Sequence, residues 1–162
     1  MAQAKEHRYA VTTQWTGAAR GPARDYGGYS REHSFEIPGK PAIIGSSDPN
    51  FMGDASRHNP EEMLVASLSG CHMLWYLHLC TVKGVVVEAY EDAAEGVMVE
   101  EPRNGRMTGV TLRPVVTISA DSDAARAEQL HERAHAECFI ANSMNFPVRC
   151  LPTIRKADTA VA

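Results

Sequence analysis

One stretch constrains the fold of this 162-residue chain more than any other, namely the long apolar run that follows Asn59. Asn59 is a favoured helix N-cap, Pro60 suits the first helical position, and Glu62 stands where a capping-box side chain returns to the cap. At the far end, Lys83 supplies a cation and Gly84 a residue that is free to adopt positive φ. The sequence therefore predicts one long, central helix over this stretch.

This helix is apolar around most of its circumference, which predicts packing on several sides. An inward-facing stripe follows the helical spacing: Leu64, Leu68, Cys71, Leu74 or Trp75, and His78. The small residues Ser67, Ser69 and Gly70 lie beside Cys71 and would let another backbone approach closely. Two interpretations are open at this point, a crossing helix from a second subunit or ordinary packing of small side chains.

The segments around this helix predict strands and a second helix. Extended chain is expected over Glu6–Trp15, Gly28–Ile37, Val85–Glu100, Met107–Ala120 and Pro147–Arg155. Asn104–Gly105 favours a hairpin turn. The second helix is expected over Asp121–Cys138, with a core stripe of Ala127, Leu130, Ala134 and Cys138 or Ala141. Length and element order predict a single domain over residues 1–162, with a frayed, disordered tail at 157–162.

The charge of the chain argues against two classes of partner. Its formal net charge of −4 and pI near 6.0 provide no electrostatic footprint for nucleic acid or an anionic membrane. The N-terminus lacks the apolar region of a secretory signal, and no run is expected to reach the length of a membrane span. A cytoplasmic protein is therefore expected, in which the four cysteines are reduced thiols.

A cysteine in an apolar helix can fill a core, bind a metal or do chemistry. For the metal hypothesis, His131, His135 and Cys138 are spaced at i, i+4 and i+7 on one helical face. Cys71 could then be the fourth ligand of a tetrahedral zinc ion, with His72 and His78 as spare donors. No C-x-x-C ligand pair accompanies them.

The alternative is a redox pair of Cys71 and Cys138, in which one thiol is oxidised and the other resolves it. Such chemistry needs a thiolate, and a free cysteine with a pKa of about 8.5 is mostly protonated at neutral pH. Cys71 lies mid-helix, beyond the reach of the helix dipole, so a nearby arginine must stabilise the thiolate. The candidates are Arg20, Arg24, Arg31 and Arg57, with Glu61 as a carboxylate that could hold the guanidinium.

Two motifs carry a resemblance to a known family. The chain has N-P-E-E, then the cysteine of S-G-C-H-M ten residues after the first Glu, and a second helix that ends H-A-E-C-F-I-A-N-S. This arrangement resembles the OsmC/Ohr family of osmotically inducible and organic hydroperoxide resistance proteins. The similarity covers the whole chain in element order and is strongest over Phe51–Cys80 and Leu130–Val148.

The resemblance implies an α+β fold with antiparallel sheets around a long central helix and a second helix, in an intertwined homodimer with active sites at the subunit interface. It implies that Cys71 is the peroxidatic cysteine, Cys138 the resolving cysteine, and Glu61 the carboxylate that pairs with an arginine. For that arginine we favour Arg31, then Arg57, then Arg20. The chain departs from the family at C-F-I-A-N-S, where Cys-Pro is common.

Helix geometry adds a constraint of its own. Glu61 and Cys71 are ten residues apart, which is about 15 Å along a straight helix. Glu61 can therefore serve Cys71 only if the helix breaks or if the Glu comes from the partner chain. We expect the second arrangement, in a homodimer.

The expected function is a thiol peroxidase that reduces organic hydroperoxides to alcohols in oxidative-stress defence, through a sulfenic acid and an intramolecular disulfide. It would use no cofactor or metal, and an external lipoyl-type or thioredoxin-type dithiol would reduce the disulfide. The alternatives are a family member with little peroxidase activity that senses redox state or binds a small ligand, and a Cys/His zinc-binding protein. Cys80 and Cys150 are expected to be buried structural thiols, and His72 a hydrogen-bonded core or interface residue.

Overall fold

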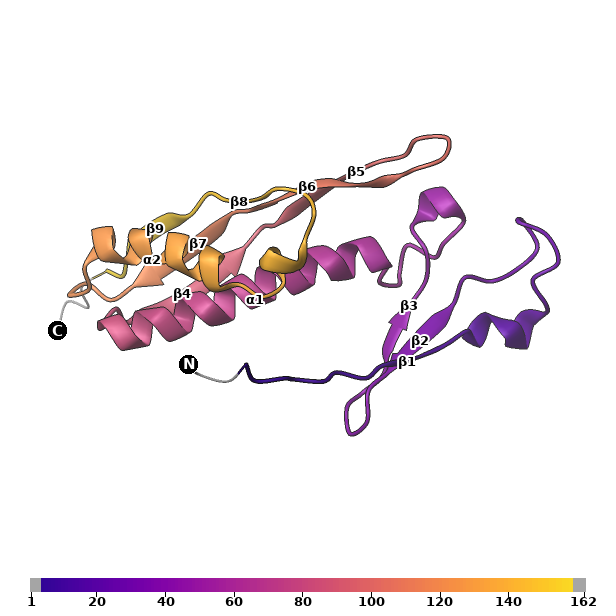
Figure 1. Ribbon diagram of the computed structural model, residues 1–162, viewed down its shortest axis with the longest axis horizontal. Coiled ribbons are helices and arrows are strands. Elements are labelled where there is room, and N and C mark those ends of the chain that lie inside the picture. The colour runs from indigo at the N-terminus through magenta and orange to yellow at the C-terminus, as the bar shows by residue number, and fades with distance from the viewer. Residues whose placement is uncertain (1–3, 159–162) are drawn as a thin grey trace. The chain divides into compact units, whose positions relative to one another are not determined.

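The computed structural model describes residues 4–158, which fall into two compact units that divide after Met63 (Figure 1). The first unit contains β1 (Thr12–Gln14), η1 (Thr16–Arg20), β2 (His33–Glu36), β3 (Ile43–Gly45) and η2 (Pro49–Phe51). Its strands form an antiparallel sheet in the order β1-β2-β3. Within β2 the buried residue is Ser34, and its neighbours His33 and Phe35 are half-buried.

The second unit holds most of the long helix and the remaining elements. They are α1 (Pro60–Lys83, which begins in the first unit), β4 (Val87–Asp92), β5 (Glu95–Val99), β6 (Arg106–Leu112), β7 (Pro114–Ile118), α2 (Ala124–Glu137), η3 (Ala141–Ser143), β8 (Val148–Cys150) and β9 (Thr153–Lys156). In the view of Figure 1, α1 runs along the lower side of the strands of this unit, and α2 lies near the C-terminal end of α1.

The strands of the second unit form two sheets, ordered β4-β7-β9 and β5-β6-β8. Because only short breaks separate β4 from β5, β6 from β7 and β8 from β9, three chain segments pass through both sheets. The last segment pairs in parallel, β8 with β6 and β9 with β7. The expected antiparallel pairing holds for β4 with β7 and for β5 with β6. The last segment pairs in parallel because α2 and η3 lie between β7 and β8 and return the chain to β6, so that β8 runs in the same direction.

The start of α1 has the capping box that the sequence predicts. The Asn59 side chain accepts a hydrogen bond from the Glu62 backbone N–H at 2.8 Å, and the Asn59 backbone N–H donates to the Glu62 carboxylate at 3.3 Å. At the other end Gly84 adopts φ of +72°, as the sequence suggested. Both ends are therefore fixed by local interactions.

Replacing the cap should destabilise the protein measurably. We expect Asn59→Ala to lower the free energy of unfolding by about 1 to 2 kcal/mol. The reason is that removal of the buried Asn59 amide leaves the Glu62 backbone N–H without its hydrogen-bond acceptor. Denaturant unfolding of both proteins measures the change. The control is Asn145→Ala, at an exposed asparagine, and an equal loss in the two variants would contradict the role of the cap.

The core of the second unit lies between α1, α2 and the strands. The residues of α1 that are buried in it are Leu68, His72, Tyr76, Leu79 and Cys80. The last three pack with the α2 stripe of Ala127, Leu130 and Ala134, as the sequence predicted, whereas Leu68 packs in a second cluster with β6. For α1 the predicted stripe was wrong at Leu74 and His78, which face outward in the described chain. Trp75, the predicted alternative to Leu74, does pack against the core.

α1 is also long and apolar enough to cross a membrane, as judged by its 24 residues and their composition alone. The expectation that no run reaches this length is therefore wrong for α1. A core helix passes the same test, and α1 contributes to both core clusters of this unit. Its length is consequently weak evidence for a membrane partner.

The C-terminal end continues to pair after β9. The Ala157 N–H donates to the Ile118 carbonyl at 2.8 Å, so that the start of the predicted tail is hydrogen-bonded. The rest of that prediction, residues 159–162, lies outside the described residues.

Candidate functional site

Cys71 and Cys138 meet although 67 residues separate them in the sequence. Cys71 lies half-buried in the middle of α1, and Cys138 is the buried C-cap of α2. Their side chains are within hydrogen-bonding reach, and both are free thiols. The packing of α2 against α1 therefore brings together the two cysteines that the redox interpretation pairs.

The environment of Cys138 keeps its proton in place. Burial raises the pKa of the Cys138 thiol to about 11, and the hydrogen bond to Cys71 raises it further than burial alone would. The Ala141 N–H donates to the Cys138 sulfur at 3.4 Å and acts in the opposite direction. At neutral pH Cys138 is consequently a thiol that can donate a hydrogen bond.

Glu61 is half-buried in the first turn of α1. Because α1 is unbroken from Pro60 to Lys83, Glu61 is about 15 Å from Cys71 along the axis. Among the described residues Glu61 has no ion pair with an arginine. Glu61 could serve Cys71 of its own chain only if the helix broke between them, and the structure excludes such a break.

Arg31 is held by its own loop. Its guanidinium donates to the backbone carbonyl of Tyr29 at 2.5 Å and to that of Tyr26, and it stacks over the Tyr29 ring at 3.9 Å from the ring centre. The Met52 sulfur lies 3.8 Å away. Within residues 4–158 no carboxylate pairs with Arg31, so its positive charge is not offset.

Arg20 and Arg57 share a different carboxylate, that of Glu32. The distances from Glu32 to the guanidinium nitrogens are 3.0 Å for Arg20 and 3.9 Å for Arg57, and Arg57 also lies 3.8 Å from Asp54. Sequence reasoning missed Glu32, because nothing in the spacing of these residues indicates that the loops converge.

A second cluster joins His72, His131 and Cys150, which we call the His–His–Cys cluster. His72 Nε2 lies 3.0 Å from His131 Nδ1, and the Cys150 sulfur lies 3.5 Å from the former and 3.9 Å from the latter. The three residues come from α1, α2 and the end of β8. The sequence did not indicate Cys150 as a ligand, because this residue is far in sequence from both histidines and follows no helical spacing.

Burial keeps both imidazoles of the cluster neutral at pH 7. It lowers the pKa of His72 to about 4 and that of His131 to about 3, and each is lowered further by a neighbouring histidine. Burial, with a contribution from the Asp92 charge, raises the pKa of the Cys150 thiol to about 12. The predicted hydrogen-bonded role of His72 is confirmed. Of the two thiols that were expected to be buried, Cys80 is buried, whereas the prediction is wrong for Cys150, which is half-buried.

The zinc set proposed from spacing is not assembled. The described residues contain one group of three donors that could share a metal ion, and it is the His–His–Cys cluster. The spacing argument fails because α2 ends at Glu137, and Cys138 turns into extended backbone at ψ of 107°. Cys138 therefore leaves the helical face of His131 and His135 and meets Cys71 instead.

An apolar hollow lies on the outward face of α1, one turn beyond Cys71. It has a volume of about 330 Å³ and is lined by Leu74, Trp75 and His78. Phe139, which directly follows Cys138, packs edge-on against Trp75 with the ring centres 5.4 Å apart. Leu74 and Phe139 are 66% and 68% exposed, so this chain leaves a large apolar surface beside the two thiols.

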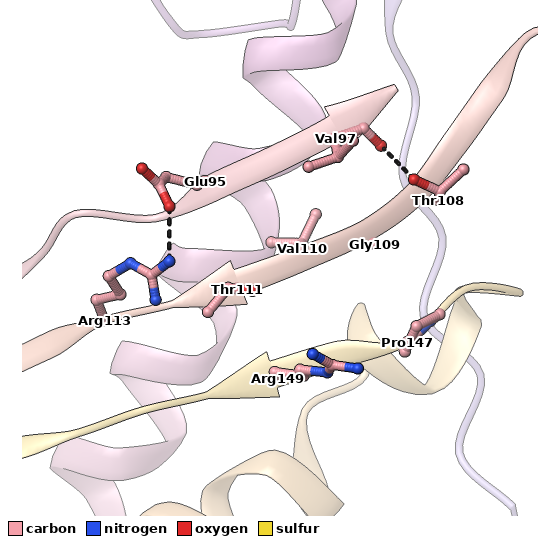
Figure 2. A pocket seen from close by; sticks show the side chains of 9 residues that line it. All are labelled: Glu95, Val97, Thr108, Gly109, Val110, Thr111, Arg113, Pro147 and Arg149. Atoms are coloured by element: carbon pink, nitrogen blue, oxygen red, sulfur yellow. Dashed lines mark hydrogen bonds and ion pairs between the residues drawn. The ribbon is translucent and has the colours of Figure 1, made fainter. Parts of the chain in front are cut away.

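A second hollow, of about 310 Å³, lies on strands β5, β6 and β8 (Figure 2). Its most prominent polar feature is the ion pair between Arg113 and Glu95, at 2.7 Å. Figure 2 also shows the Thr108 hydroxyl directed at the Val97 carbonyl, to which it donates at 3.2 Å. No cysteine or histidine lines this hollow, so it belongs to neither thiol cluster.

Comparison with known proteins finds a family model that matches more than half of the chain. The family model for OsmC-like protein matches residues 53–150, which include both cysteines of the pair. No curated protein sequence matches the chain.

Solved structures share the fold over nearly the whole chain. An OsmC-like protein of unknown function from Vibrio cholerae is 31% identical, with a TM-score of 0.83, and the match covers 91% of this chain and 99% of that one. An organic hydroperoxide resistance protein OsmC from Legionella pneumophila is 17% identical, with a TM-score of 0.67 and coverages of 93% and 98%. OhrB, the organic hydroperoxide resistance protein of Bacillus subtilis, is 18% identical, with a TM-score of 0.60 and coverages of 92% and 98%.

Proposed function

The chain belongs to the family of OsmC-like proteins, and on that premise we propose that it is a thiol peroxidase that reduces organic hydroperoxides to alcohols. The observation that carries the proposal is the contact between the free thiols of Cys71 and Cys138. The family also includes proteins named for organic hydroperoxide resistance, which supports a role in the response to peroxide stress.

The reaction begins with the Cys71 thiolate. It attacks the distal oxygen of the hydroperoxide, the O–O bond breaks, and the alkoxide leaves as the alcohol after it gains a proton. Cys71 is now a sulfenic acid. The Cys138 sulfur attacks this sulfur, and the hydroxyl group leaves as water with the Cys138 proton. The net change is oxidation of two thiols to one disulfide and reduction of one hydroperoxide to alcohol and water.

The different surroundings of the two cysteines support this assignment of roles. The raised pKa of Cys138 keeps that residue protonated until the sulfenic acid forms beside it. Cys71 is less buried, so a peroxide can reach it. We assign Arg31 to the Cys71 thiolate ahead of Arg57 and Arg20, because the charges of the latter two are shared with Glu32.

The active form in this proposal is a homodimer. Glu61 and Cys71 lie too far apart on one unbroken helix to act together, so the partner subunit would supply the Glu that holds the arginine. The exposed apolar surface around Leu74 and Phe139 supports a partner beside the thiol pair.

The substrate class follows from the same surface. The Leu74, Trp75 and Phe139 side chains offer apolar contact close to Cys71 and Cys138, which favours an organic hydroperoxide over hydrogen peroxide. A cytoplasmic dithiol of the lipoyl or thioredoxin type would reduce the disulfide by exchange, and the cycle requires no metal or cofactor.

The proposal is tested by counting thiols. Reduced protein treated with a slight excess of cumene hydroperoxide should lose two of its four thiols and only about two hydrogen masses, because a disulfide adds no atoms. Mass spectrometry and thiol titration measure both. Cys138→Ser should stop at a sulfenic acid on Cys71, which a dimedone-type reagent traps.

The matched control is Cys80→Ala, at a cysteine that is buried away from the pair. This variant should still form the disulfide and therefore keep one free thiol after reaction. If Cys71 of the folded wild-type protein did not react, the peroxidase proposal would be wrong, and the redox-inactive, ligand-binding alternative would replace it.

A further inference from the structure

The His–His–Cys cluster has the donors and the spacing of a transition-metal site. A tetrahedral zinc ion with nitrogen ligands at 2.0–2.1 Å and a sulfur ligand at 2.3 Å would hold two nitrogens about 3.3 Å apart, and nitrogen and sulfur about 3.6 Å apart. The observed distances are 3.0 Å between the nitrogens, and 3.5 Å and 3.9 Å from nitrogen to sulfur. The three donor atoms thus already lie near three corners of a tetrahedron of ligands around one ion.

The cluster is held in place by the fold. His72 and His131 are buried, and their ring planes are nearly parallel, at 6°. Tyr76 stacks on His131 with ring centres 3.8 Å apart, which fixes the orientation of that imidazole. Cys150 ends β8, where it pairs with Leu112 of β6. These donors need little movement to share an ion, and little ordering entropy opposes binding.

The two histidines face each other through one nitrogen each, 3.0 Å apart. Two neutral imidazoles that meet through one nitrogen each can place only one proton between them, so at least one facing nitrogen carries a lone pair. The remote nitrogens, His72 Nδ1 and His131 Nε2, have no hydrogen-bond partner among the described residues. Each ring therefore makes its hydrogen bonds only at the cluster. A cation that binds both facing nitrogens takes the place of the proton between them, and that proton moves to the remote nitrogen of its ring.

A cavity gives access to the cluster. It has a volume of about 260 Å³, and its walls include His131 and Cys150. His135, one helical turn after His131, also lines it, and its buried Nδ1 has no hydrogen-bond partner in the described chain. The carboxylates of Glu128 and Glu132 line the same cavity. An ion can enter here, and a fourth ligand is available from the cavity side.

We propose that His72 Nε2, His131 Nδ1 and the Cys150 thiolate bind a divalent cation of the zinc type, with the fourth position open toward the cavity that His135 lines. Two imidazoles and one thiolate suit a borderline-soft cation and disfavour magnesium or calcium, which prefer oxygen ligands. Binding replaces the Cys150 proton, which leaves to solvent. The ion links α1, α2 and β8, and it uses neither Cys71 nor Cys138.

The test uses the reduced, metal-free, full-length protein and Co²⁺ as the probe. One equivalent should give the intense visible bands of tetrahedral cobalt together with a thiolate-to-cobalt charge-transfer band, and Zn²⁺ should displace it. Cys150→Ser should remove the charge-transfer band and weaken binding by more than about 100-fold, because loss of a ligand costs more than loss of its supporting hydrogen bond. Circular dichroism checks that the variant is folded.

The matched control is Cys71→Ser, which should leave the cobalt spectrum and the affinity unchanged. Loss of the charge-transfer band in this variant would place the ion at the redox pair and would overturn the proposal, as would the absence of cobalt binding by folded wild-type protein. X-ray absorption of the zinc-loaded wild type needs no variant: it should find one sulfur ligand and at least two imidazoles, and two sulfurs would contradict the site. None of these measurements depends on peroxidase activity.

Discussion

A heterodimer of Glu61→Gln and Cys71→Ser chains should recover about half of the wild-type peroxidase activity, although each homodimer is nearly inactive. Cys71→Ser removes the nucleophile and should lower kcat/KM by about 10³-fold or more. Glu61→Gln weakens the ion pair with the arginine that stabilises the thiolate, and this substitution should lower kcat/KM by roughly 10²-fold. Recovery is expected because one of the two sites combines Cys71 of one chain with Glu61 of the other.

The physical basis is the unbroken helix. Glu61 and Cys71 are ten positions apart in α1, which is continuous between them, so that the two residues lie about 15 Å apart along the axis. The heterodimer is prepared by co-expression with two different affinity tags and tandem purification, and its turnover of cumene hydroperoxide is measured with a dithiol reductant.

A reciprocal heterodimer distinguishes the two arrangements. If each site uses both chains, the wild-type chain paired with a Glu61→Gln, Cys71→Ser double mutant has both sites damaged and should be nearly inactive. If each site lies within one chain, that same heterodimer keeps about half of the activity, and the first heterodimer keeps almost none. The second pattern would refute the shared site, while the thiol chemistry of Cys71 and Cys138 would still stand.

Leu68→Ala should lower the free energy of unfolding by about 2 to 5 kcal/mol. Leu68 is 1% exposed and packs with Val110 and Leu112 of β6, so its removal leaves a cavity between α1 and the sheet. Because Leu68 lies one helical turn before Cys71, this packing also fixes the position of the Cys71 thiol relative to the sheet. Denaturant unfolding at fixed protein concentration measures the loss.

Leu151→Ala is the matched control for this substitution. Leu151 is 57% exposed, between β8 and β9, so truncating it should change the free energy of unfolding by no more than about 0.5 kcal/mol. Equal effects at the two leucines would mean that the burial of Leu68 does not determine its contribution to the free energy of unfolding. Leu68 would then not be a core residue.

The sequence was most informative where interactions are local. The ends of α1 could be predicted, because the capping box of Asn59 and Glu62 and the positive φ of Gly84 depend only on residues a few positions apart. The core stripe of α2 could be predicted for the same reason, since a mainly polar helix shows its apolar face clearly.

The same reasoning failed for the faces of α1. Apolar residues surround this helix, so periodicity could not separate the buried face of His72 and Tyr76 from the outward face of Leu74 and His78. A surface that is apolar because it meets a partner has the same sequence pattern as one that faces the core of its own chain.

The sequence by itself determined that a long capped helix carries a cysteine at its centre and that a second helix ends in another cysteine, because helix signals act over a few residues. Only the tertiary structure decided which side chains meet. It joined Cys71 to Cys138, gave Arg20 and Arg57 the Glu32 carboxylate, and united His72, His131 and Cys150 in one cluster. These contacts form between segments that lie far apart in the chain, and their geometry depends on how whole elements pack.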